Sequence, residues 1–157
     1  MEGFCYSSRP SPLPTHRNTA GIAAIHPIHK GLSGTAGTFY VCDRGNGWAV
    51  GRFLTPDMSQ CPKLVSSIEV TSVPQLVSDA ALAVGSDGFD LIKMDIEGGE
   101  QAVFSAPDLS WLRSPKFMSL ELHERYAPGC EKLVAAKLNA VAMHKLVTDG
   151  EYVVYRA

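Results

Sequence analysis

The chain has 157 residues, of which 45% are hydrophobic and 19% charged, proportions typical of one globular domain with a sizeable core. Its 14 basic and 16 acidic side chains give a formal net charge of -2 at pH 7. This balance provides no electrostatic footprint for DNA, RNA or an anionic membrane, and no apolar run approaches the roughly 18 residues that a membrane span needs. We therefore expect neither a nucleic-acid partner nor a membrane partner.

Residues 1–24 are predicted to be an irregular leader, because they are rich in proline and show no apolar periodicity. Their only acidic residue is Glu2. The acid-poor composition weakly resembles an organelle-targeting segment, but the Arg-rich amphipathic pattern of such segments is missing. We therefore place the domain at residues 25–157 and expect a cytoplasmic protein.

From residue 38 onward the chain alternates between strand and helix patterns. Ser72, Pro74 and Gln75 form the start signal of a helix. The expected elements, in chain order, are a hairpin of 38–42 with 49–54, a strand at 64–71, a helix ending near Gly85, a strand at 89–96, a short helix to about 105, a helical turn between Pro107 and Pro115, a strand at 116–122, a helix at 131–146 and a strand at 152–155. This alternation predicts an α/β fold with a largely parallel sheet and helices on its faces.

The cysteines are spaced without a C-x-x-C pair and without a nearby histidine. We interpret Cys5, Cys42, Cys61 and Cys130 as reduced, mostly structural thiols. In the cytoplasm small buried thiols are more common than disulfides or zinc ligands.

Two of the expected strands end in polar residues. Asp95, Glu97 and Glu100 lie at or just after the end of the strand at 89–96. Glu121 and His123 lie at and just after the end of the strand at 116–122, on one side of it, because side chains alternate along a strand. Ligands of open α/β sheets bind at the carboxyl ends of the strands. If the two strands are adjacent and parallel, the acids and the imidazole converge on one crevice.

A structural interpretation of the same residues stays open. Glu97 and Glu100 could simply complement a helix dipole, and Gly98 with Gly99 could allow a sharp turn. His123 could be a hydrogen-bonded histidine at a strand end, and Lys93, which faces away from Ile92 and Met94, could pair with an acid or lie under a helix.

The segment from Asp90 to Glu100, DLIKMDIEGGE, resembles the hallmark D-L-[LI]-K-x-D-[VI]-E-G-x-E of the FkbM family of S-adenosylmethionine-dependent methyltransferases. Residues 31–41, 68–76 and 117–123 resemble other segments of that family more weakly. The resemblance extends over roughly residues 25–155.

This resemblance implies a Rossmann-like methyltransferase sheet with flanking helices, S-adenosyl-L-methionine as cofactor, and methylation of a hydroxyl on a small or sugar-containing acceptor. The family's Gly-rich turn and the acidic residue that ends its second strand are not found before residue 25. The chain therefore looks like the carboxyl half of the domain, without its first strands. The cofactor-binding residues are unknown, and we expect residues 1–157 alone to bind the cofactor poorly.

The resemblance also suggests roles for the acidic segment. Asp95 is the first candidate for orienting or deprotonating the acceptor hydroxyl, with Glu97 beside it, and Glu100, Glu121 and His123 are candidates for binding the substrate. Two rival functions remain: a truncated, non-catalytic remnant or binding module, and a metal-dependent enzyme with Asp95, Glu97 and His123 as ligands.

Overall fold

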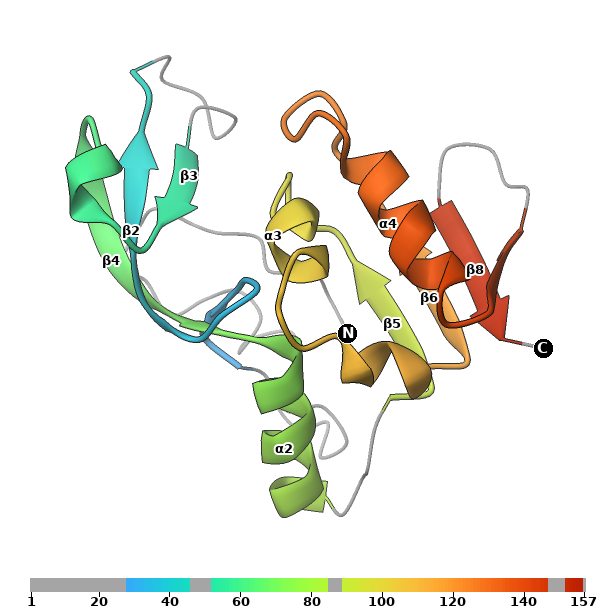
Figure 1. Ribbon diagram of the computed structural model, residues 1–157. Helices are drawn as coiled ribbons and strands as arrows, with labels where there is room; N and C mark the ends of the chain where they lie inside the picture. Colours follow the sequence, from blue (N-terminus) through green and yellow to red (C-terminus); the bar gives the residue numbers. More distant parts are fainter. Residues whose placement is uncertain (1–27, 46–51, 85–88, 147–151, 157) are drawn as a thin grey trace, which may run out of the picture.

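The computed structural model describes residues 28–45, 52–84, 89–146 and 152–156, except for the side chains of Arg52 and residues 80–84. These residues form a mixed α/β structure with two four-stranded sheets (Figure 1). The leader expected at 1–24 lies outside the described residues, as do residues 25–27. No helix in the described part of the chain is long and apolar enough to cross a membrane.

The first sheet is built around a long antiparallel pair. Its strands are β1 (Gly31–Leu32), β2 (Gly37–Asp43), β3 (Arg52–Thr55) and β4 (Leu64–Thr71), in the order β1-β4-β2-β3. β2 pairs antiparallel with both β3 and β4, whereas β1 pairs parallel with β4. The expected strand at 64–71 is confirmed. The expected hairpin is confirmed as the β2–β3 pair, although residues 46–51 lie outside the described residues.

Helix α2 (Val73–Val84) follows β4 without a loop, as its start signal predicts. The hydroxyl of Ser72 accepts a hydrogen bond from the backbone N–H of Gln75 at 3.4 Å, which satisfies one of the free donors in the first turn. The side chain of Gln75 does not complete the capping box, because it donates to Asp79 at 2.8 Å.

The second sheet contains β5 (Leu91–Met94), β6 (Phe117–Leu120), β7 (Met143–Leu146) and β8 (Tyr152–Arg156), in the order β5-β6-β8-β7. β5 and β6 are adjacent and parallel, as expected. The chain between them forms α3 (Glu100–Phe104) and the 3₁₀ helix η3 (Ser110–Arg113). β8 pairs antiparallel with β6 and β7, and α4 (Cys130–Asn139) lies beside the sheet (Figure 1).

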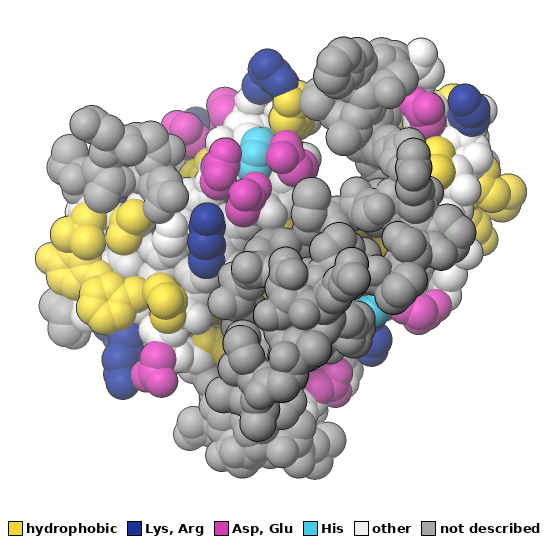
Figure 2. Space-filling view, turned by 180° about the vertical axis from the view of Figure 1, so that it is seen from behind, with side chains coloured by type: hydrophobic (Ala, Val, Ile, Leu, Met, Phe, Trp, Pro, Cys, Tyr) yellow, Lys and Arg dark blue, Asp and Glu magenta, His cyan; other side chains and the backbone are white. Residues whose placement is uncertain are grey.

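The core lies between one face of this second sheet and the helices α3, η3 and α4. Alternate residues of β5 and β6 point into it, among them Ile92, Met94, Met118 and Leu120. Their neighbours Leu91 and Phe117 pair with each other and point to the opposite face, where they are 59% and 50% exposed. Figure 2 shows hydrophobic side chains gathered on that side of the molecule. The described helices therefore cover one face of the sheet.

Two fold expectations are wrong. Most strand pairs in the described residues are antiparallel, so neither sheet is largely parallel. The helix expected at 131–146 ends at Asn139, and residues 143–146 form β7 instead. Ala142 has a positive φ of 57°, which breaks the helical path, and pairing with β8 then satisfies the backbone of Met143–Leu146.

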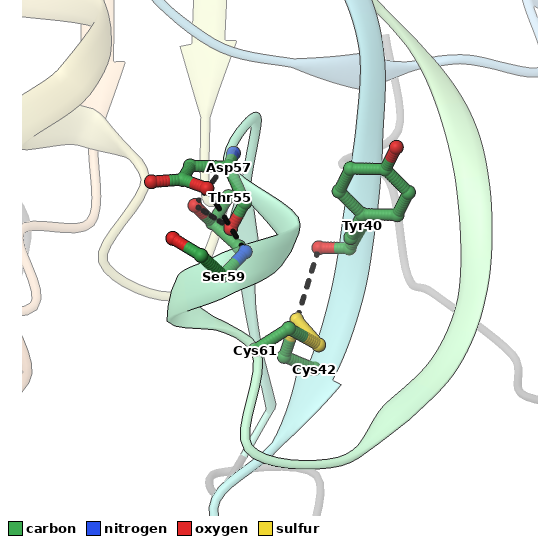
Figure 3. The surroundings of a disulfide bond; sticks show 6 residues. All are labelled: Tyr40, Cys42, Thr55, Asp57, Ser59 and Cys61. Carbon is green, nitrogen blue, oxygen red and sulfur yellow. Dashed lines mark hydrogen bonds between the residues drawn. A yellow bond between two sulfur atoms is a disulfide. The ribbon is translucent and has the colours of Figure 1, made fainter.

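The expectation of reduced thiols is also wrong for one pair of cysteines. Cys42 near the end of β2 and Cys61 after the 3₁₀ helix η2 (Met58–Gln60) form a disulfide with a Cα–Cα distance of 5.3 Å. In Figure 3 the Cys42 sulfur also lies near the carbonyl oxygen of Tyr40, at 3.6 Å. Disulfides persist in oxidising compartments, so this bond weighs against the cytoplasmic expectation.

The turn that carries Cys61 is held by local hydrogen bonds. The carboxylate of Asp57 accepts the backbone N–H of Ser59 at 2.9 Å, and the backbone N–H of Asp57 donates to the hydroxyl of Thr55 at 3.1 Å (Figure 3). These contacts position the residues before Cys61 against the end of β3. The disulfide therefore joins the β3–β4 connection to β2.

Cys130 matches the expectation of a structural thiol, because it is free and fully buried at the start of α4. Burial raises the pKa of its thiol to about 11, and the nearby carboxylates of Glu100, Glu124 and Glu131 add to the effect. Since the thiolate is the reactive form, Cys130 is expected to be chemically inert in the folded protein. Cys5 lies outside the described residues.

Removing the disulfide should destabilise the protein through the entropy of its unfolded chain. For a sequence separation of 19 residues, the chain-entropy estimate is about 3 kcal/mol. We expect the C42S/C61S double variant to lose about that much free energy of unfolding in urea, and to be insensitive to added reductant. The intact protein should fall to the same stability when it is reduced. Equal stability of the oxidised and reduced protein would contradict a disulfide at this position.

Candidate functional site

The acidic residues predicted from the sequence converge on one histidine. Atom Nε2 of His123 lies 3.4 Å from Glu97 Oε2, 3.8 Å from Asp95 Oδ1 and 3.9 Å from Glu121 Oε1. Asp95 follows β5, whereas Glu121 and His123 follow β6, so the parallel pairing brings them to the same sheet edge. The expected convergence of these residues is confirmed, and we call Asp95, Glu97, Glu121 and His123 the acidic cluster.

The carboxylates of the acidic cluster are open to solvent, whereas its histidine is not. The side chains of Glu97, Glu121 and Asp95 are 74%, 53% and 34% exposed, and that of His123 only 12%. Figure 2 shows acidic side chains gathered around a histidine on this surface. The arrangement therefore offers several hydrogen-bond acceptors to a molecule that arrives from solvent.

A tight turn carries Glu97 to the histidine. Glu97 and Gly98 both have positive φ angles, 53° and 98°, and the backbone N–H of Gly99 donates to the carbonyl of Ile96 at 3.1 Å. A positive φ costs a non-glycine residue roughly 1–2 kcal/mol. A side chain at position 98 would also meet the Cβ of Tyr126 at 3.1 Å, a tight contact. The positive φ therefore favours glycine there, and the close packing adds to that preference.

Glu100 differs from the other acids because it is fully buried. Its Oε1 accepts the backbone N–H of Ile96 at 2.9 Å and lies 3.2 Å from His123 Nδ1, while its Oε2 accepts the backbone N–H of Gly98 at 2.9 Å. Both oxygens are thus engaged within the protein. The sequence groups Glu100 with the substrate-binding candidates, but the structure places it beneath the acidic cluster.

Two neighbours of the site escaped the sequence analysis. The ring of Tyr126 stacks on His123, with centroids 5.9 Å apart and planes at 13°, and Arg125 contacts the Tyr126 ring and hydroxyl. An aromatic residue three positions after a histidine in a turn is a weak signal that fits many surface loops. Lys93 is exposed and forms no ion pair with a described residue, so it does not pair with the acids.

Three of these side chains could hold a metal ion. Ligand atoms of Asp95, Glu121 and His123 all lie within 4.8 Å of one another. Nitrogen and carboxylate oxygen ligands of this kind suit Zn²⁺ or Mn²⁺. The set expected from the sequence contained Glu97 in place of Glu121. Glu97 and Glu121 both lie within 4 Å of Nε2 of His123, so either carboxylate is close to the same ring nitrogen.

A separate surface groove of about 810 Å³ lies at the opposite end of β5. It is lined by α2 and η3, with Phe89, Asp90 and Trp111 among its walls. Asp90 forms an ion pair with Lys116 there at 2.7 Å. This groove is distant along the strand from Asp95, so it is not part of the acidic cluster.

Comparison with protein-family models, with curated proteins and with solved structures gives no match for this chain.

The residue after the acidic cluster provides a pH-dependent test of the local structure. The exposed carboxylate of Glu124 accepts the backbone N–H groups of Glu131 and Gly129 at the start of α4, at 2.9 Å and 2.5 Å. These hydrogen bonds lower the pKa of Glu124 below its ordinary value of 4.5. Because the folded pKa is the lower one, this stabilisation is complete above about pH 4.5 and is lost as the pH falls through the folded pKa.

We therefore expect E124Q to have a lower melting temperature than the parent at pH 7, and this difference to shrink on acidification towards pH 3. Thermal unfolding followed by circular dichroism across this range measures both proteins. A melting-temperature difference that is constant with pH would show that the charge of Glu124 does not cap α4.

Proposed function

We propose that the chain carries the acceptor-binding part of an S-adenosylmethionine-dependent methyltransferase that methylates a hydroxyl of a small or sugar-containing molecule. The observation that carries the proposal is the acidic cluster at the shared carboxyl edge of the parallel strands β5 and β6. This edge is where α/β enzymes bind their ligands. Two of its four residues, Asp95 and Glu97, also lie in the segment that resembles the FkbM hallmark, residues 90–100.

The reaction requires a base and a positioned acceptor. S-adenosylmethionine, when bound, supplies an electrophilic methyl group on a sulfonium. A hydroxyl that accepted this methyl group would have to give up its proton to a base. Asp95, which is partly exposed at the strand end, is our candidate for that base. Glu97 and Glu121 can accept hydrogen bonds from further hydroxyls of a sugar-like acceptor.

The described residues fit the acceptor side of this reaction better than the cofactor side. Gly98 and Gly99 lie at the strand end, but a Cβ at either would meet Tyr126 or Ile96 within 3.3 Å. These glycines therefore serve the packing of the turn and do not open a cradle for a cofactor. We assign no residue to cofactor binding.

Replacing the candidate base tests the proposal. In the protein expressed from its complete gene, Asp95→Asn keeps the size of the side chain and removes the basic oxygen. We expect turnover of a radiolabelled methyl group to fall by roughly 10²–10⁴ with little change in melting temperature. The matched control is Asp90→Asn at the other end of the same strand, where the side chain is 83% exposed, and it should leave turnover unchanged.

Full methyl transfer by the Asp95→Asn variant would remove the base from the proposal and assign the acidic cluster a structural role. Absence of transfer in the parent protein towards a panel of sugars and small alcohols would favour the non-catalytic binding module.

A second candidate function, a metal-dependent enzyme, is favoured by the close approach of ligand atoms from Asp95, Glu121 and His123. Calorimetric titration with Mn²⁺ and Zn²⁺ tests it. Under this alternative the parent protein binds one ion, and Asp95→Asn or Glu121→Gln weakens binding at least tenfold, whereas Asp90→Asn does not. Heat signals indistinguishable from dilution in the parent would exclude the metal alternative and leave the methyltransferase proposal intact.

A further inference from the structure

Glu100 is a buried carboxylate whose one ionisable partner among the described side chains is the imidazole of His123, at 3.2 Å. It is fully inaccessible to solvent, and no Lys or Arg among the described residues forms an ion pair with it. Burying an ionised carboxylate is costly unless hydrogen bonds compensate. The compensation comes from two backbone amides, of Ile96 and Gly98, and from the His123 ring. Because burying this carboxylate is unfavourable, we expect the groups that it binds to depend on it, and two roles follow from its contacts.

The first role of Glu100 is to stabilise the turn that brings Glu97 to His123. The two amides bonded to Glu100 flank Glu97, one on each side in sequence. The positive φ of Glu97 lies between these two amides, and the positive φ of Gly98 follows the second one directly. Because the left-handed conformation of Glu97 is unfavourable by itself, the turn depends on contacts such as these. Glu100 therefore helps to place the Glu97 carboxylate beside His123 Nε2.

The second role of Glu100 is to set the protonated nitrogen of the His123 ring. An ionised carboxylate only accepts hydrogen bonds, so the contact from Glu100 to Nδ1 requires a proton on that nitrogen. In the neutral ring Nε2 is then unprotonated and faces the three exposed carboxylates. The stacked Tyr126 ring limits rotation of the imidazole. Glu100 and Tyr126 together fix which ring nitrogen meets an incoming ligand.

We propose that Glu100 is a positioning residue of this site: it sets the tautomer and orientation of His123 and the shape of the 95–98 turn without touching the substrate. The inference deepens the proposed function and rests on it for its effect on turnover. The tautomer itself is independent of that function. His123 Nε2 is thereby the ring atom available to the acceptor hydroxyl or its neighbours.

The test is the ¹⁵N signature of His123 in histidine-labelled protein, read from long-range ¹H–¹⁵N correlations at an alkaline pH where the neutral ring is observed. We expect the Nδ1–H tautomer in the parent protein. Glu100→Gln offers one acceptor oxygen where three donors need partners, so the Nδ1–H signature should be lost. Glu97→Gln, which alters a contact to the other nitrogen, is the matched control and should retain it.

Turnover provides the second readout. If the methyltransferase proposal holds, Glu100→Gln should lower kcat by roughly 10–100-fold, the range found when the hydrogen-bond partner of a metal-ligating histidine is removed. An Nε2–H tautomer in the parent, or an unchanged tautomer in Glu100→Gln, would overturn the positioning role whatever the turnover. The parent measurement decides the question even if the variant does not fold. If the parent protein shows the expected tautomer but no methyl transfer, the proposed function is refuted and the positioning role of Glu100 still stands.

Discussion

The carboxylate of Glu100 is shared among three donors that come from two neighbouring strand ends. Two are backbone amides of the turn after β5, and the third is the ring of His123 after β6. The parallel pairing of β5 with β6 makes this sharing possible, because it brings both strand ends to one edge. Glu97 and His123 of the acidic cluster depend on these hydrogen bonds for their placement. Without Glu100 the turn would keep its unfavourable positive φ angles but lose two of the hydrogen bonds that stabilise it.

Packing of the second sheet against its helices holds this sheet edge in place. Ile92, Met94, Met118 and Leu120 anchor β5 and β6 in the core against α3, η3 and α4. Arg156 of β8 donates to the carbonyls of Val141 and Leu112, each at 2.7 Å, which ties β8 to the turn after α4 and to η3. The acidic cluster therefore stands on regular, well-packed elements, as the precise placement of a functional site requires.

Local signals predicted much of this arrangement. The alternation and β-branched residues of 64–71 define β4, and Ser72 with Pro74 marks the start of α2. The polar residues at two strand ends predict the site, because ligands of open α/β sheets bind at the carboxyl ends of the strands. In each case residues close in sequence carry the information, so no tertiary structure was needed.

Features that depend on distant contacts were not predictable in the same way. The helical periodicity of 131–146 gave no sign that pairing with β8 would convert its last residues into β7. Cys42 and Cys61 approach each other only once β2 pairs with β4 and the η2 turn folds back. Glu100 has the same residue type as Glu97, and charged side chains are almost never fully buried unless paired. Its burial becomes clear only when α3 packs beneath the turn.

Amide hydrogen exchange in the native protein tests the account most directly. The amides of Ile96 and Gly98 donate to the buried carboxylate of Glu100, whereas that of Gly129 donates to the exposed carboxylate of Glu124. If Glu100 organises the site, Ile96 and Gly98 exchange much more slowly than Gly129, at rates close to those of the β5 amides. Exchange of Ile96 and Gly98 as fast as that of Gly129 would contradict the account, because the turn would then open without disturbing the core.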